Sequence, residues 1–195
     1  MTHRRRLRSV WNRVDSGEIH QAPRKWQSWL SDTGSLTQKI EQSIGSRLEV
    51  WVLRDERQNL NSDESRYFHF KVKRCRVREV LLCFDGKPLV MARSIIPTSS
   101  SSGSNQAILR LGRTPLGGVL FSKFRSHSKS RPLREIACLN KGDYFWKTCQ
   151  KRYPSLTPSI WARRTLYDLR GHKLLVSELF LPELLQNHRY TASQT

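Results

Sequence analysis

Apolar and polar residues alternate along much of this chain, and the pattern predicts more β-strands than helices. The clearest case is a hairpin of residues 78–84 and 87–97, whose apolar runs are joined by Asp85-Gly86, a pair that favours a tight two-residue turn. Because side chains alternate between the two faces of a strand, Arg78 shares a face with the apolar residues two, four and six positions later. A guanidinium among such neighbours needs an acidic partner, which either the protein or a ligand supplies.

A second hairpin, of residues 161–169 and 174–181, is predicted around a turn at Arg170-Gly171. Its second strand is apolar on both faces apart from Ser177 and Glu178, which is typical of a central strand that is covered on both sides. A carboxylate in such a strand must find partners or take up a proton. Two interpretations stay open: Glu178 belongs to an ion pair near the strand end, or it lies in a pocket where it meets a ligand.

Helical spacing is limited to short segments. Apolar residues at 26, 29 and 30 predict a short helix that ends at residues 32–34. A second helix begins after Ser35, with Gln38 three residues later as in a capping box, and Leu36 starts its apolar stripe. Taken from the residues alone, Leu36 is a core position.

The segment Thr114-Pro115-Leu116-Gly117 has the features of a helix N-terminus. Threonine suits the N-cap and proline suits the first helical position. The backbone N–H groups of Leu116 and Gly117 then lack partners within the helix, and such a terminus favours anions. The alternative is an ordinary capped helix without a ligand.

The remaining segments complete the predicted domain. Residues 48–54 and 133–137 have strand patterns, residues 55–64 form a polar loop, and residues 143–155 form a surface connection or a short helix over the sheet. Residues 66–76 mix aromatic and basic side chains, which indicates either nucleic-acid contact or an amphipathic strand with one wet face. The excess of hairpins over helices predicts an α+β fold, with an antiparallel sheet and helices packed on one side.

The length and the net charge of the chain limit the number of domains and the kinds of partner that we expect. The 195 residues suffice for a single domain, which we expect over residues 23–183, after a basic and mobile arm (1–22) and before a C-terminal tail (184–195). The formal net charge of +19 attracts anions, whether nucleic acid, acidic membrane or small acidic metabolites. No apolar run approaches the ~20 residues of a membrane span, and no secretory signal follows the basic start. We therefore expect a cytoplasmic protein.

The four cysteines do not form a metal-binding pattern. They lack Cys-x-x-Cys spacing and do not combine with nearby histidines, so we expect reduced thiols and no metal site. The cysteines are Cys75, Cys83, Cys138 and Cys149.

Several motifs together resemble the chorismate pyruvate-lyase (4-hydroxybenzoate synthase) family. Each motif is weak alone, and the specificity lies in their order and spacing over residues 23–183. They are Ser35-Leu36-Thr37, Arg78-Glu79-Val80-Leu81-Leu82-Cys83, Asp85-Gly86 with Pro88, Ala92-Arg93-Ser94, the run Leu111-Gly112-Arg113-Thr114-Pro115-Leu116-Gly117, and Ser177-Glu178-Leu179-Phe180-Leu181-Pro182.

The resemblance implies a monomer with a sheet of about six antiparallel strands and no metal or organic cofactor. The implied reaction eliminates pyruvate from chorismate to give 4-hydroxybenzoate, the first step of ubiquinone biosynthesis. By the family's motif, Arg78 and the backbone N–H of Leu116 bind the ring carboxylate, and Glu178 faces the ring hydroxyl. Leu36 matches a position that lines the site, where the family also uses methionine.

The implied chemistry agrees with the residues. Chorismate is a dianion with a flat ring, so a guanidinium and a helix N-terminus suit its carboxylate, and a buried carboxylate suits its hydroxyl. We take Arg78 as the anchor and Glu178 as the hydroxyl partner; because burial raises a carboxyl pKa, Glu178 is also a candidate for acid/base work. The group that takes the ring proton stays open. Candidates for the enolpyruvyl carboxylate are Arg54, Arg76 and Arg93.

Two other functions are compatible with features of the sequence. The same fold resembles the effector domain of bacterial transcription regulators, so a non-catalytic domain that binds small aromatic acids is the main alternative. Those regulators carry an N-terminal DNA-binding domain, and 22 residues before Pro23 are too few for one. The +19 charge suggests nucleic-acid binding, but no binding motif is present and the basic residues are dispersed, so we expect no specific nucleic-acid partner.

Overall fold

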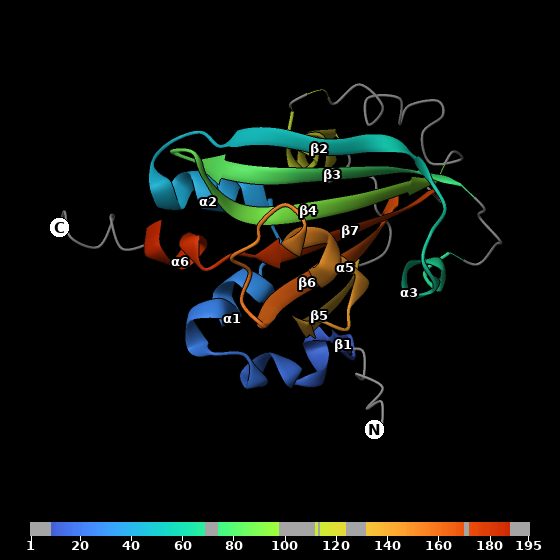
Figure 1. Cartoon of the computed structure of the whole chain (residues 1–195), viewed down its shortest axis with the longest axis horizontal. Coiled ribbons are helices and arrows are strands. Elements are labelled where there is room, and N and C mark those ends of the chain that lie inside the picture. Colours follow the sequence, from blue (N-terminus) through green and yellow to red (C-terminus); the bar gives the residue numbers. More distant parts are fainter. Residues whose placement is uncertain are drawn as a thin grey trace.

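The computed structural model describes residues 9–68, 74–97, 112, 114–123, 132–169 and 172–187. In this part of the chain, one twisted antiparallel sheet runs through the molecule, in the order β1-β5-β6-β7-β4-β3-β2 (Figure 1). The strands are β1 (Asn12–Arg13), β2 (Glu49–Gln58), β3 (Cys75–Phe84), β4 (Lys87–Pro97), β5 (Leu133–Asn140), β6 (Ser159–Leu169) and β7 (His172–Phe180). The antiparallel α+β fold is confirmed.

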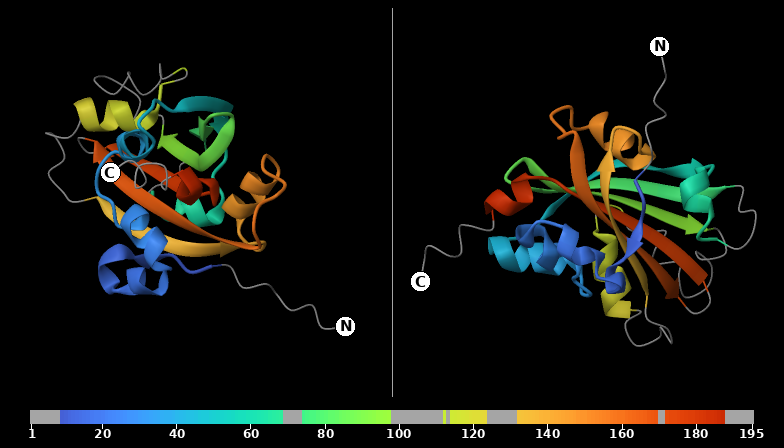
Figure 2. Two further views of the ribbon diagram at one scale, coloured as in Figure 1. Left: turned by 90° about the vertical axis from the view of Figure 1, so that its left-hand side faces the viewer. Right: turned by 90° about the horizontal axis from the view of Figure 1, so that it is seen from below.

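Short helices cover both faces of this sheet. In the left view of Figure 2, α1, α2 and α4 lie on one side and α5 lies on the other. The helices are η1 (Val14–Ser16), η2 (Glu18–Gln21), α1 (Arg24–Leu30), α2 (Leu36–Ile44), α3 (Ser62–Ser65), α4 (Leu116–Lys123), α5 (Tyr144–Gln150) and α6 (Glu183–Asn187). The prediction that helices pack on one side was wrong. Because β3, β4 and β7 bury apolar residues on both of their faces, both faces need a cover.

The central strand is β7, which pairs with β4 on one side and β6 on the other. This confirms the central position predicted for the strand that carries Glu178. The β3–β4 hairpin is also confirmed: Asp85 and Gly86 have φ angles of 49° and 68°, the left-handed conformation that a tight hairpin turn requires. The turn predicted at residues 170–171 lies outside the described residues.

The sheet has seven strands in the described residues, one more than the expected six, because part of the basic arm joins it. Strand β1 pairs with β5, Trp11 is buried in the core, and the Ser9 hydroxyl donates to Asp143 at 2.7 Å. The chain is therefore folded before residue 23, the boundary that we predicted. It also continues past residue 183, since Leu184 of α6 is buried.

Strand β2 extends through Gln58, so the predicted loop of residues 55–64 begins too early. Asp55 is in the strand, directly opposite Arg78 of β3. The polar pattern hid the strand because β2 is an edge strand, and an edge strand tolerates charged side chains. The rest of that loop includes α3, which Asn61 and Glu64 cap reciprocally.

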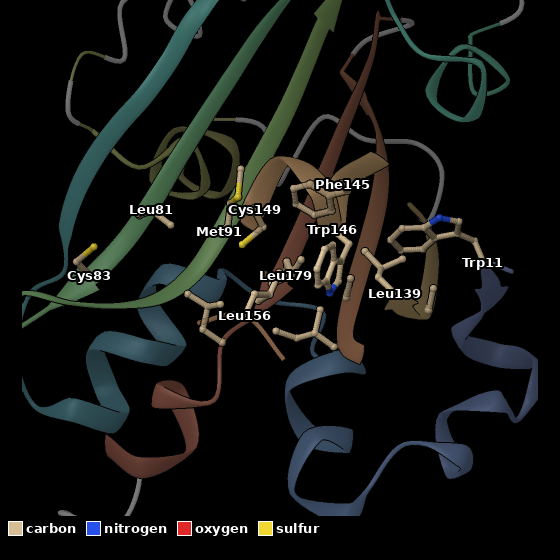
Figure 3. Packing of buried hydrophobic residues seen from close by; sticks show 14 residues of the cluster. Trp11, Leu81, Cys83, Met91, Leu139, Phe145, Trp146, Cys149, Leu156 and Leu179 are labelled. Atoms are coloured by element: carbon tan, nitrogen blue, oxygen red, sulfur yellow. The ribbon is translucent and has the colours of Figure 1, made fainter. Parts of the chain in front are cut away.

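The core on the α5 face is built around aromatic side chains (Figure 3). Trp146 and Phe145 of α5 pack with Leu179 of β7 and Met91 of β4, and Trp146 Nε1 donates to the Thr157 carbonyl at 3.0 Å. In the described residues, all four cysteines are free: Cys138 is exposed and the others are buried. None of the described helices is long and apolar enough to cross a membrane.

We predict that Trp146→Ala lowers the free energy of unfolding by about 3–5 kcal/mol, because it empties the centre of this core. Trp51→Ala is the matched control, since Trp51 is 43% exposed on the edge strand β2, and should cost less than about 1 kcal/mol. Urea unfolding measures both values. Equal losses in the two variants would contradict this account of the core.

Candidate functional site

A cavity lies between the sheet and the N-terminal ends of α2 and α4. Its walls are mostly apolar and come from β3, β4, β6, β7 and the two helices. The lining residues are Leu36, Thr37, Arg78, Val80, Leu82, Ala92, Ser94, Pro115, Leu116, Gly117, Leu120, Tyr167, Val176 and Glu178. An apolar cavity with a few convergent polar groups is the usual form of a small-molecule site.

Arg78 supplies the cation of this cavity. Its side chain is almost fully buried, and Nη1 donates to Asp55 Oδ2 at 3.0 Å. Nη2 donates to the Gly112 carbonyl at 2.7 Å and to the Thr114 carbonyl at 3.5 Å. Arg78 thereby fixes the segment that precedes α4 and places the start of that helix beside its own guanidinium.

The start of α4 lies against the start of α2. A Cβ atom at Gly117 would lie 3.2 Å from Ser35 Oγ and 3.5 Å from Thr37 Oγ1, so glycine permits this close approach. Ser35 caps α2 by accepting from the Gln38 N–H at 3.4 Å, as predicted. Two helix N-termini, each with the positive end of a helix dipole, therefore meet at the cavity.

Glu178 lies two strands away from Arg78. Ala92 of β4 is opposite Glu178 in the sheet, and Ser94 of the same strand is opposite Arg78. The usual spacings of a sheet place the Glu178 and Arg78 Cα atoms about 12 Å apart. The cavity thus has a positive end and a carboxylate end with an apolar middle.

Arg163 holds the Glu178 carboxylate. The two residues are opposite each other on β6 and β7, and both Nε and Nη2 of Arg163 lie 2.7 Å from Glu178 Oε2. Arg163 Nη1 also donates to the Trp29 and Asp32 carbonyls, at 3.1 and 2.7 Å. Burial lowers the pKa of Arg163, but the charge and hydrogen bond of Glu178, together with the nearby Tyr167 and Asp32, outweigh burial and raise it. Both Arg163 contacts to Glu178 end on Oε2, and within the part of the chain that the structure describes no group donates to Oε1.

Tyr167 lines the cavity beside these charges. Burial and the nearby Glu178 carboxylate raise the pKa of the Tyr167 phenol to about 12. The hydroxyl is therefore neutral at physiological pH, and a neutral phenol can donate a hydrogen bond as well as accept one.

The four site residues taken from the sequence, Leu36, Arg78, Leu116 and Glu178, all line this one cavity. The three arginines named for a second carboxylate do not. Arg54 pairs with Glu79 and Glu56, Arg76 pairs with Asp55, and Arg93 is buried between Glu64 and Glu79. In the described residues, no cluster of three or more His, Cys, Asp or Glu side chains could hold a metal ion.

Two important residues were missed from the sequence. Arg163 follows the apolar residues 160–162 in β6, and an arginine that a strand carries into the core needs an acidic partner. Asp55 was assigned to a loop, although the strand pattern can be continued through residue 58. Neither pattern says which acid meets which base, because that depends on strand register.

The amino-acid sequence matches a known protein family over nearly its whole length. The family model described as chorismate lyase matches residues 6–190. This chain belongs to the chorismate lyase family.

Named relatives support this assignment over most of their length. A probable chorismate pyruvate-lyase of Azoarcus sp. (strain BH72) is 36% identical over 166 residues, which are 84% of this chain and 87% of that protein. The corresponding protein of Aromatoleum aromaticum is 39% identical over 167 residues, 84% of this chain and 88% of that protein. The chorismate pyruvate-lyase of Salmonella schwarzengrund is 32% identical over 163 residues, 79% of this chain and 81% of that protein.

Solved structures share the fold at low sequence identity. A GntR-family transcriptional regulator from Bacillus cereus has a TM-score of 0.53 and 12% identity, over 71% of this chain and 94% of that chain. The effector domain of PhnF from Mycobacterium smegmatis has a TM-score of 0.52 and 13% identity, over 78% of this chain and 91% of that chain. These likenesses concern the fold alone.

We predict that Arg163→Gln lowers the free energy of unfolding by about 3–5 kcal/mol, because it leaves Glu178 buried without its cation. Adding Glu178→Gln to this variant should recover part of the loss, which a double-mutant cycle by urea unfolding measures. Arg13→Gln is the control, since Arg13 and Asp15 form an exposed pair at 4.0 Å that contributes less than about 1 kcal/mol. Additive losses for Arg163 and Glu178 would contradict the coupling.

Proposed function

We propose that this protein is a chorismate pyruvate-lyase, which eliminates pyruvate from chorismate and releases 4-hydroxybenzoate for ubiquinone biosynthesis. The observation that carries the proposal is the polarity of the cavity in a chain of the chorismate lyase family: a guanidinium and helix N-termini at one end, a carboxylate at the other, and apolar walls between them. Relatives of similar length bear the name of this activity.

The substrate fits the cavity in one orientation. Its ring carboxylate pairs with Arg78 and accepts from the backbone N–H of Leu116, while the ring hydroxyl donates to Glu178 Oε1. Leu36, Val80 and Val176 contact the flat ring. The opposite orientation would place two carboxylates together at Glu178, where their like charges repel.

For this reaction, the main task of the protein is to position the substrate. A C–H bond of the ring breaks, its electron pair forms the last ring double bond, and the C–O bond to the enolpyruvyl group breaks. The departing enolpyruvate takes up a proton and becomes pyruvate, so the atoms and charges balance. Because aromatisation drives the reaction, the protein contributes by holding the reactive conformer between Arg78 and Glu178 and by stabilising the developing anion.

The pairing of Glu178 with Arg163 supports its role as an acceptor. With Arg163 on Oε2, the carboxylate is held in one direction, and Oε1 accepts from the ring hydroxyl. No cofactor is required by this chemistry. A monomeric state, a cytoplasmic location and the lack of a specific nucleic-acid partner stay predictions.

A non-catalytic domain that binds aromatic acids is the alternative, because regulators share the fold. Both proteins would bind 4-hydroxybenzoate, but only the enzyme converts chorismate. Turnover therefore decides between them.

We predict that the wild-type protein forms 4-hydroxybenzoate and pyruvate in equal amounts from chorismate. Glu178→Gln and Arg78→Ala should each lower kcat/KM on the order of 100-fold, because each removes a charged hydrogen-bonding partner of the substrate. Absorbance of 4-hydroxybenzoate and a coupled pyruvate assay measure the two products. Glu56→Gln and Arg57→Ala, both exposed on β2, are the charge-matched controls. A folded wild type that binds 4-hydroxybenzoate without turnover would support the regulator-like alternative.

We predict that Leu116→Pro weakens 4-hydroxybenzoate binding about tenfold, because it removes the backbone N–H assigned to the carboxylate. Proline is compatible with the first position of a helix, which Leu116 occupies in α4. Leu116→Ala keeps the N–H and loses the side chain, so calorimetric titration of both variants separates the two contributions. Equal affinities in the two variants would rule out the amide contact.

A further inference from the structure

Arg76 lies outside the cavity, yet it is the main partner of the carboxylate that also binds Arg78. Asp55 Oδ1 accepts from Arg76 Nε at 2.5 Å, and Asp55 Oδ2 accepts from Arg76 Nη2 at 2.8 Å. Arg78 makes a single contact to the same carboxylate, from Nη1 to Oδ2 at 3.0 Å. Arg76 and Arg78 are two residues apart on β3, so they share a face and reach Asp55 on β2 together.

Arg76, Arg78 and Asp55 form a triad in which the negative charge of Asp55 is shared unequally between the two arginines. Two guanidiniums and one carboxylate leave a formal charge of +1. A bidentate pair is the stronger arrangement, so the Asp55 charge is compensated mainly by Arg76. Arg78, the member that lines the cavity, keeps most of its own positive charge for a ligand.

Arg78 also keeps donors for a ligand. A guanidinium has five N–H groups. Within the described part of the chain, Arg78 uses three hydrogen bonds, to Asp55, Gly112 and Thr114. Two N–H groups are then available for a carboxylate.

Asp55 is charged at the pH of the cell. Burial raises its pKa, but the hydrogen bonds and positive charges of Arg76 and Arg78 together outweigh burial and lower the pKa below its ordinary value. The Asp55 carboxylate therefore always competes with a ligand carboxylate for Arg78. If Arg76 were lost, both Asp55 oxygens would turn to the Arg78 guanidinium.

We propose that Arg76 is a positioning residue for the substrate carboxylate: by holding Asp55, it prevents Asp55 from neutralising Arg78. The proposal rests on the proposed function, since it needs a carboxylate ligand at Arg78. Arg76 acts through Asp55 and does not contact the ligand.

The test is Arg76→Gln, with calorimetric titration of 4-hydroxybenzoate and steady-state kinetics on chorismate. The Kd for 4-hydroxybenzoate and the KM for chorismate should rise about tenfold, because the ligand carboxylate must now displace Asp55. The value of kcat should change little, since the carboxylate contact is the same in the ground and transition states. The Kd for the neutral analogue 4-hydroxybenzamide should be unchanged.

Removing the competitor supplies the decisive control. Adding Asp55→Asn to Arg76→Gln should restore the affinity for 4-hydroxybenzoate, whereas a purely structural role of Arg76 predicts no restoration. Arg57→Gln removes the same charge from a neighbouring exposed position and should leave Kd unchanged.

The outcomes separate this proposal from the proposed function. A wild type that neither binds 4-hydroxybenzoate nor converts chorismate would overturn both. A wild type that binds, together with an Arg76→Gln variant of equal affinity or one that Asp55→Asn does not rescue, would overturn the role of Arg76 alone. If Arg76→Gln does not fold, Asp55→Asn alone gives the answer: it should bind 4-hydroxybenzoate at least as tightly as the wild type, and weaker binding would contradict the proposal.

Discussion

The ion pair between Glu178 and Arg163 is the interaction on which the site depends. A carboxylate in the central strand of a sheet that is covered on both faces carries a large desolvation cost, and Arg163 on the neighbouring strand offsets that cost. Because both Arg163 contacts end on Oε2, the pair leaves Oε1 without a contact from Arg163. Arg163 further bonds the carbonyls that precede α2, so the same residue positions the helix whose N-terminus forms the cavity.

The opposite end of the cavity follows the same rule with opposite charges. Arg78 is buried and is stabilised by Asp55 and by the carbonyls before α4. At each end, a buried charged side chain is paired with an oppositely charged residue. The pairing does not use all of the hydrogen-bonding groups of the charged side chain that lines the cavity. A ring with a carboxylate and a hydroxyl at opposite positions is complementary to this arrangement, since these two groups each meet a partner of opposite character.

Much of the fold followed from alternation. The β3–β4 hairpin, the central position of β7 and the Ser35 cap of α2 were predicted from local patterns, because turn chemistry and strand period are local properties. The four site residues came from the ordered motifs, and the structure brings them to one cavity. The pairings of Arg163 with Glu178 and of Asp55 with Arg78 could not be predicted, since strand register decides them. The burial of Trp11 was missed because a basic segment without periodicity gives no local sign of long-range contact.

The most direct test of the account is a crystal structure of the protein with 4-hydroxybenzoate. We predict that the carboxylate of the ligand binds Arg78 and the Leu116 N–H, with its hydroxyl on Glu178 Oε1 and the Glu178–Arg163 pair intact. A ligand bound outside this cavity, or bound inside it with its carboxylate beside Glu178, would contradict the assignment of the two ends.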